Sequence, residues 1–321
     1  MKVCSWSART LAFMALFVVL ALNPVLAAGP PKTLQKVKVV MVGDRLVDVA
    51  WKLGIAPTGM VSRLSLWSKG REVALVAQAL GCANKVTVMA PASLSTFMKK
   101  TGVTRVIVEK YTPTCLYKDI DFGKIPDLVK DVPGATVEYV DFDSGLDSAV
   151  ADIAAKFGKE ERGKELISAY EENMKQAETA LPGKPLGKRV VVLSGTYSSS
   201  TGKTFVNVEA PGGYSDQFFL SRLGCVNAAA PMIPDPSAVS KGHASTPRLH
   251  GLKQANPDVI VMVGNAFAVQ KALQGALVRD PGLADVPAIK NRAVFTLPFY
   301  VAADLLDYPD FLRQWTLALQ D

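Results

Sequence analysis

Aromatic and arginine side chains recur in the loops that follow the predicted strands of this chain. Phenylalanine, tyrosine and tryptophan rings offer flat apolar faces to a large ring or metal chelate, and arginine binds the carboxylates or phosphates of such a molecule. The residue types therefore predict a site for a large anionic ligand. The candidate ligand-binding residues are Arg45, Arg63, Trp67, Tyr111, Tyr197, Tyr214, Phe299 and Tyr300.

Some of these residues have an alternative structural explanation. Arg45 can instead pair with Asp44 or Asp48 at the start of a helix. Trp67 stands among polar residues and fits ordinary packing as well as it fits a ligand site. The tyrosines that directly follow predicted strand ends favour the ligand site.

The histidines offer little for catalysis or metal binding. His243 and His250 are the two histidines of the sequence, and both lie in a segment with Pro and Gly that contains no evident nucleophile to pair with. A zinc or manganese site rich in histidine is hard to build from two residues. We therefore expect a binding protein rather than an enzyme, with no catalytic residue, no metal ligand and no cofactor.

Length and charge narrow the class of protein. The 321 residues suggest two domains of about 150 residues each. The 36 Lys and Arg residues outnumber the 29 Asp and Glu residues, so the net charge is +7. No run of five basic residues occurs, and we therefore expect no nucleic-acid partner.

Residues 1–28 have the pattern of a secretory signal peptide. Lys2 and Arg9 precede an apolar stretch at 11–22, and small residues around Ala27 suit cleavage by signal peptidase. The apolar stretch is shorter than the roughly 20 residues that span a bilayer, although a retained membrane anchor is the alternative. We expect a mature chain that is exported to the periplasm.

Cleavage leaves three cysteines, and the sequence does not fix their state. They are Cys82, Cys115 and Cys225. An odd number in an oxidising compartment leaves at least one thiol free. Cys82 and Cys225 each follow a Leu-Gly pair, and we expect both to be small buried residues. Cys115 lies in a loop-like stretch, where a thiol that touches the ligand is the alternative.

Strand-like and helical segments alternate in both halves of the mature chain. The strands predicted from apolar runs are 37–42, 85–89, 105–108, 136–140, 189–193, 259–263 and 294–297. The predicted helices are 46–53, 73–80, 94–100, 217–223 and 308–319. This alternation predicts two α/β lobes, each with a parallel sheet that is covered on both faces.

A long amphipathic stretch separates the two halves. The chain has no proline at 144–181, and apolar residues recur there at helical spacing, with Gly158 as the place for a bend. The predicted organisation is a signal peptide at 1–28, an N-terminal lobe at 29–145, a bridging helix at 146–182 and a C-terminal lobe at 183–321. The predicted fold is therefore two doubly wound α/β lobes joined by a long helix. Ligands bind beyond the carboxyl ends of parallel strands, so we expect the ligand cleft between the lobes.

Several phrases of the sequence occur in a characteristic order. They are 53–61, 214–229 with Leu-Gly-Cys-Val-Asn-Ala, 256–260 with Asn-Pro-Asp-Val-Ile, 280–282 and 286–294. Together they resemble the periplasmic substrate-binding proteins of ABC importers for iron-siderophore complexes, haem and cobalamin. The resemblance implies two lobes with small-amplitude closure, and capture of an iron chelate or tetrapyrrole-like ligand for an inner-membrane permease. We expect a monomer.

The sequence departs from this family at its expected docking surface. The family usually carries a surface glutamate on each lobe that pairs with an arginine of the permease. The comparable stretches here, 91–100 and 246–250, contain no acidic residue. Two alternatives therefore remain open: a sensor or scaffold module for another membrane partner, and a periplasmic metal chelatase on the same architecture.

Overall fold

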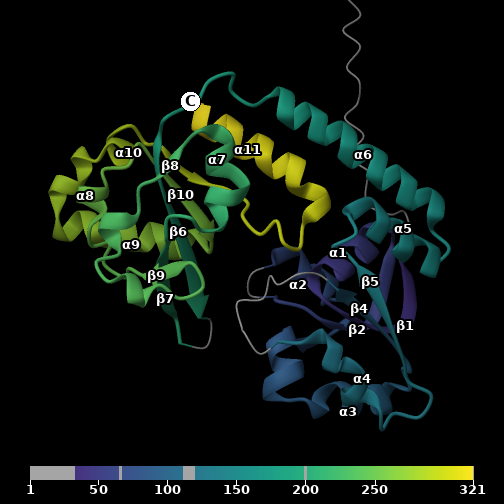
Figure 1. The fold of residues 1–321 in the computed structure, drawn as a ribbon. Helices are drawn as coiled ribbons and strands as arrows, with labels where there is room; N and C mark the ends of the chain where they lie inside the picture. The colour runs from purple at the N-terminus through teal and green to yellow at the C-terminus, as the bar shows by residue number, and fades with distance from the viewer. Residues whose placement is uncertain (1–32, 65–66, 111–119, 199–200, 321) are drawn as a thin grey trace, which may run out of the picture.

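The computed structural model describes residues 33–64, 67–110, 120–198 and 201–320, which form two α/β lobes (Figure 1). The predicted signal peptide, Tyr111 and Cys115 lie outside the described residues. Within these ranges, no helix is both long and apolar enough to cross a membrane. The two-lobed α/β fold that the alternating pattern predicts is confirmed.

The first lobe is built on a parallel sheet of five strands in the order β3-β2-β1-β4-β5. The strands are β1 (Gln35–Val42), β2 (Ile55–Val61), β3 (Gln78–Gly81), β4 (Arg105–Lys110) and β5 (Thr136–Asp141). The helices are α1 (Asp44–Lys52), α2 (Ser68–Val73), α3 (Ala92–Thr101), α4 (Ile125–Val129) and α5 (Leu146–Lys156). Val39 and Met41 of β1 enter one core, and Val40 and Val42 enter the core on the other face. Burial on both faces explains the unbroken apolar run of β1.

The second lobe has a mixed sheet in the order β11-β10-β6-β7-β9, with β8 beside β6. The strands are β6 (Arg189–Ser198), β7 (Lys203–Glu209), β8 (Val226–Asn227), β9 (His243–Ser245), β10 (Val259–Gly264) and β11 (Val294–Thr296). The helices are α7 (Ser221–Leu223), α8 (Leu252–Ala255), α9 (Ala266–Arg279), α10 (Pro287–Lys290) and α11 (Tyr308–Gln320). Strand β7 is antiparallel to β6 and β9. Because β6 pairs with β10 only as far as Gly195, the β6–β7 hairpin extends beyond the rest of the sheet.

The edge of the first sheet differs from the prediction. The segment 85–89, expected as a strand, is a π-helical turn, and β3 overlaps the end of the segment expected as a helix at 73–80. The valines and the threonine of 85–89 are typical of a strand. In the structure, however, the Thr87 hydroxyl donates a hydrogen bond to the Ala83 carbonyl oxygen at 2.9 Å, within the turn. Strand β2 is not predicted from the sequence, because Pro57 and Gly59 interrupt its apolar run.

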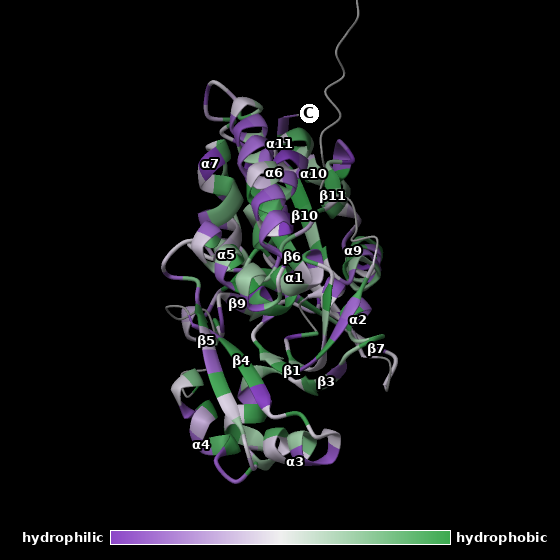
Figure 2. Cartoon of the chain, turned by 90° about the vertical axis from the view of Figure 1, so that its right-hand side faces the viewer, coloured by the Kyte–Doolittle hydropathy of each residue, from purple (hydrophilic) through white to green (hydrophobic). Residues whose placement is uncertain are grey.

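The stretch expected as one bridging helix is two helices. α5 ends in the first lobe, and α6 (Glu160–Thr179) begins after a break at Gly158, whose φ of 64° is left-handed. The helices cross closely at Gly163, where a Cβ would stand 2.8 Å from the Cβ of Ala154. Of these two helices, α6 is the one that spans the lobes, packing on α5 at one end and on α11 at the other (Figure 1). Its outer side is largely hydrophilic, whereas the buried strands are hydrophobic (Figure 2).

A second connection joins the lobes near the C-terminus. Residues 299–307, here called the crossover segment, follow β11 and lead into α11. Ala303 and Leu306 pack into a core of the first lobe, whereas Val301 packs into a core of the second lobe. The crossover segment therefore belongs to both lobes.

The two described cysteines are less buried than the sequence predicts. Cys82 and Cys225 are free thiols, and both are half-buried. Cys225 follows the end of α7, as expected, but Cys82 follows β3. Because β3 is an edge strand, the segment after it is only partly covered.

Candidate functional site

The carboxyl ends of the two sheets meet where α1, which follows β1, touches the crossover segment. The Tyr300 hydroxyl donates a hydrogen bond to Asp44 Oδ2 at 2.9 Å, and Arg45 Nε donates to the Ala302 carbonyl oxygen at 2.9 Å. The Arg63 guanidinium lies over the Tyr300 ring, 5.1 Å from its centroid. The structure thus brings together three predicted ligand-binding residues, Arg45, Arg63 and Tyr300.

This meeting point is where an open α/β sheet normally binds a ligand. The chain leaves β1 for β2 on one side and later returns to β4 on the other side, so a crevice opens at the carboxyl end of β1. Asp44 lies there and accepts hydrogen bonds from the Arg63 backbone N–H at 2.7 Å and from Arg63 Nε. Asp44 therefore fixes Arg63 and Tyr300 relative to each other.

A buried glutamate that sequence reasoning misses holds the start of α1. Glu109, at the end of β4, is 1% exposed, and its Oε2 accepts hydrogen bonds from the backbone N–H groups of Arg45 at 2.9 Å and Leu46 at 3.2 Å. A helix start leaves such donors without partners in the helix. The only signal in the sequence is position, because Glu109 directly follows the strand predicted at 105–108.

Glu109 titrates near neutral pH. Burial raises the pKa of Glu109 from 4.5 to about 7, and the negative charge of Asp44 adds to the rise, while Arg45 and Arg63 oppose it. The carboxyl group that positions Arg45 therefore gains or loses a proton within the physiological range.

We expect the free energy of unfolding to fall between pH 5 and pH 8, and Glu109→Gln to remove about 2 to 3 kcal/mol of that fall. The folded protein holds this proton more tightly than the unfolded chain, so the contribution is complete below pH 4.5 and is lost as the pH rises through about 7. Urea unfolding of both proteins at the two pH values measures the difference. Parallel pH profiles would contradict the role of Glu109.

The second lobe repeats this arrangement. Glu209, at the end of β7, is fully buried and accepts hydrogen bonds from the Ser215 backbone N–H at 2.7 Å and from the Ser215 hydroxyl at 2.5 Å. Burial raises the pKa of Glu209, and the two bonds from Ser215 oppose that rise. Glu209 thereby fixes the start of the helical turn Asp216–Leu220, which Tyr214 precedes.

Aromatic rings of the second lobe gather beside the contacts between the lobes. The ring centroids of Tyr214 and Phe299 are 4.8 Å apart, and His243 meets Phe299 edge-on at 6.3 Å. The Ala302 backbone N–H donates to the Tyr214 hydroxyl oxygen at 2.5 Å, which ties these rings to the crossover segment. Two more predicted ligand-binding residues, Tyr214 and Phe299, are therefore neighbours.

Phe205, which is not among the predicted ligand-binding residues, lies on the face of the sheet that carries His243. Glu209 stands opposite His243 in the β7–β9 register, and Phe205 is an even number of residues before Glu209, so its side chain points to that face. Phe205 is 50% exposed. We call Phe205, Tyr214, His243 and Phe299 the aromatic wall.

Tyr197 lies on the opposite face of the hairpin. The β6–β7 register pairs Tyr197 with Thr204, while Phe205 pairs with the residue before Tyr197. The face of Tyr197 is the one that α9 covers, because a Cβ at Gly195 would be 3.0 Å from Val269 Cγ2. The structure does not bring Tyr197 to the aromatic wall.

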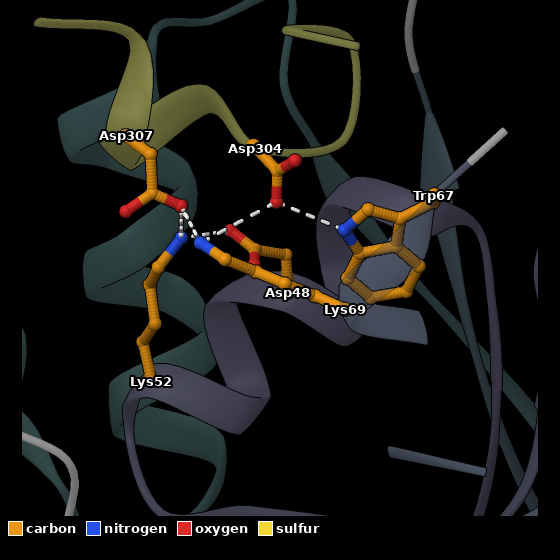
Figure 3. A network of polar contacts seen from close by, with 6 residues as sticks. All are labelled: Asp48, Lys52, Trp67, Lys69, Asp304 and Asp307. Carbon is orange, nitrogen blue, oxygen red and sulfur yellow. Dashed lines mark hydrogen bonds and ion pairs between the residues drawn. The ribbon is translucent and has the colours of Figure 1, made fainter. Parts of the chain in front are cut away.

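Trp67 is a core residue, which corrects its assignment to the ligand site. The side chain is completely buried, and the indole N–H donates to Asp304 Oδ1 at 2.9 Å (Figure 3). The ring packs on Gly70 of α2, where a Cβ would be 2.4 Å from Trp67 Cε3. The polar neighbours of Trp67 in the sequence suggest that it is exposed. It can be buried because Asp304 of the crossover segment accepts the hydrogen bond of its indole N–H.

Three carboxylates lie together beside Trp67. Oxygens of Asp48 from α1 and of Asp304 and Asp307 from the crossover segment are within 4.8 Å of one another (Figure 3). Lys52 donates to Asp48 and, at 2.8 Å, to Asp307 Oδ2, while Lys69 pairs with Asp307 and, at 3.7 Å, with Asp304. The ammonium groups supply the positive charge that a metal ion would bring, so this is an ion-pair network.

The inner part of the crevice is closely packed. A cavity of about 10 Å³ remains there, which is room for about one water molecule. Its lining residues are Gly43, Asp44, Val61, Arg63, Ala83, Glu109 and Phe122. Exposed aromatic surface lies instead at Phe205, close to the turn of the β6–β7 hairpin.

A family model described as periplasmic binding protein matches residues 109–301, which is more than half of the chain. A search of curated protein sequences gives no match.

Solved structures share the fold at low sequence identity. The periplasmic haem-binding protein BhuT, in complex with two haems, is 17% identical, with a TM-score of 0.55 over 89% of this chain and 99% of BhuT. The periplasmic haem-binding protein HutB of Vibrio cholerae is 17% identical, with a TM-score of 0.54 over 88% of this chain and 98% of HutB. RhuT from Roseiflexus sp. RS-1, a periplasmic haem-binding protein in apo form, is 16% identical, with a TM-score of 0.52 over 89% and 98%.

Proposed function

The chain belongs to the periplasmic binding protein family, and we propose that it captures an iron chelate or a tetrapyrrole between its lobes for an ABC importer. Siderophore complexes, haem and cobalamin are the members of this ligand class. In this role the protein carries its ligand unchanged and is not an enzyme.

One observation carries the proposal: Tyr214 and Phe299 of the aromatic wall contact each other, and the Tyr214 hydroxyl binds Ala302, whose carbonyl oxygen accepts a hydrogen bond from Arg45 of the first lobe. Flat rings suit the face of a macrocycle or an aromatic chelate, and guanidinium groups suit its carboxylates. Both arginines already contact the crossover segment. An anionic group of the ligand would therefore bind where the two lobes touch. The fold shared with three haem-binding proteins supports this ligand class.

The same proposal places the protein in the periplasm, with an inner-membrane permease as its partner. The signal peptide predicted at 1–28 and the family support this location. The stretches 91–100 and 246–250 contain no acid, and Arg248 and His250 are exposed. Docking to the permease would therefore use contacts other than the usual glutamate–arginine pairs.

We expect Phe205→Ser to weaken the binding of haemin, used as the probe, by about 5- to 30-fold, since one aromatic contact contributes about 1 to 2 kcal/mol. Tyr197→Ser should have a smaller effect, because Tyr197 is similarly exposed but lies on the opposite face of the hairpin. Spectrophotometric titration of the purified full chain measures both.

Tyr139→Ser is the matched control, because Tyr139 is an exposed tyrosine on β5 of the first lobe. The affinity for haemin should not change in this variant. Equal losses in Phe205→Ser and Tyr139→Ser would remove the aromatic wall from the ligand site.

A further inference from the structure

The ion-pair network between α1, α2 and the crossover segment has an uneven number of charges. Asp48, Asp304 and Asp307 contribute three carboxylates, whereas Lys52 and Lys69 contribute two ammonium groups (Figure 3). Asp48 is 0% and Asp304 is 5% exposed. Within the described residues, one negative charge of this network is left over at a place where an unbalanced charge is costly.

One carboxylate oxygen of the network, Asp48 Oδ1, can carry a proton without losing a hydrogen bond. Asp48 Oδ2 accepts a hydrogen bond from Lys52, but Oδ1 is buried without a partner among the described residues. Uncharged side chains of α5 and α6 fill the core beside α1. Val150 and Ile153 of α5 are apolar, and Tyr170 of α6 is a phenol whose pKa is raised by burial.

We propose that Asp48 carries a proton that balances this network, and that the network is a proton-controlled latch between the lobes. With Asp48 protonated, two carboxylates face two ammonium groups, and the crossover segment is held firmly on α1. When Asp48 releases the proton to solvent, a third negative charge repels Asp304 and Asp307, and the crossover segment loosens.

Burial and the neighbouring charges together favour a proton on Asp48. Burial raises the pKa of Asp48 from 3.8 to about 6, and Asp304 and Asp307 add to the rise, while Lys52 and Lys69 oppose it. The folded state therefore holds the proton more tightly than the unfolded state. The contribution of the latch is complete below pH 3.8 and is lost as the pH rises through about 6.

The latch shares two elements with the proposed ligand site. α1 carries Asp48 one turn after Asp44, and the crossover segment carries Asp304 one turn after Tyr300. Loosening the crossover segment draws Tyr300 away from Asp44 and moves the aromatic wall relative to the arginines. Under the proposed function, on which this step rests, the ligand is held more tightly below pH 6 than above it.

Hydrogen–deuterium exchange of the ligand-free full chain tests the latch directly. Amides of 299–307 should exchange up to about tenfold faster at pH 8 than at pH 5, after correction for the intrinsic effect of pH. Asp48→Asn keeps the shape of the side chain and removes this titrating charge, so the difference should shrink to the part that Glu109 contributes. Asp131→Asn, at an exposed ion pair with Lys99, is the matched control and should retain the difference.

Equal protection at the two pH values in the unmodified protein would overturn the proposal, as would a full pH difference in Asp48→Asn. If Asp48→Asn does not fold, Asp304→Asn gives the same charge count and keeps an acceptor for Trp67, so it should shrink the difference in the same way. Protection restored at pH 8 by potassium or calcium, but not by tetramethylammonium, would mean that a bound cation replaces the proton and would also overturn it. None of these results depends on a ligand, so failure of the latch and failure of the proposed function are separate outcomes.

Discussion

Lys52→Met is expected to lower the free energy of unfolding by about 3 to 5 kcal/mol, because it removes one partner of a buried ion pair. Lys52 bridges Asp48 of α1 and Asp307 of the crossover segment. Burial acts to lower the pKa of Lys52, but the two carboxylates outweigh it and raise the pKa above its ordinary value, so Lys52 stays charged. Urea unfolding at pH 7 measures the loss.

Lys99→Met is the matched control for this variant. Lys99 pairs with Asp131 at the surface, where both side chains are about half exposed. An exposed pair of this kind contributes about 1 kcal/mol or less. Equal losses in the two variants would mean that the network does not hold the lobes together.

Gly43→Ala should destabilise the protein by about 3 to 5 kcal/mol, since backbone strain and steric overlap act together. Gly43 has a φ of 124°, and a Cβ there would lie 1.9 Å from Glu109 Cδ. The glutamate cannot move away without giving up its hydrogen bonds to the start of α1. Thermal and urea unfolding measure the change.

Gly102→Ala separates the two causes. Gly102 also has a positive φ, of 67°, but nothing lies within 4 Å of a Cβ built there. This variant should cost only the strain of a left-handed residue, about 1 kcal/mol. A loss as large as that of Gly43→Ala would show that contact with Glu109 is not what makes Gly43 necessary.

The sequence is informative where a strand is buried on both faces. β1, β4 and β10 are apolar runs because both of their faces enter a core, so composition alone identifies them. β2 and β3 are missed for local reasons. Pro57 and Gly59 interrupt β2, and β3 is a short edge strand with little buried surface.

The proposed ligand site is partly predictable because loops after parallel strands converge. This rule brings Arg45, Arg63, Phe299 and Tyr300 to one place, where Tyr214, which follows the antiparallel strand β7, joins them. It fails for Trp67, whose acceptor Asp304 lies 237 residues away. Contacts between such distant residues leave no pattern in the local sequence.

The charge balance of the ion-pair network also cannot be predicted from the local sequence. Asp48 and Lys52 stand at helical spacing, which predicts an ordinary surface pair. In the folded chain Asp48 is buried, and Asp304 and Asp307 of the crossover segment lie beside it and leave the group with one extra negative charge. Burial, which decides the behaviour of these groups, is a property of the folded chain.

The absorption spectrum and native mass of the protein, purified from periplasm without refolding, test the central claim most directly. We predict a co-purified chromophore with the matching extra mass, or, for an empty protein, a rise in melting temperature with haemin, cobalamin or a ferric siderophore. A clean mass of the polypeptide alone, with no thermal shift from any of the three, would contradict the capture of a metal chelate between the lobes.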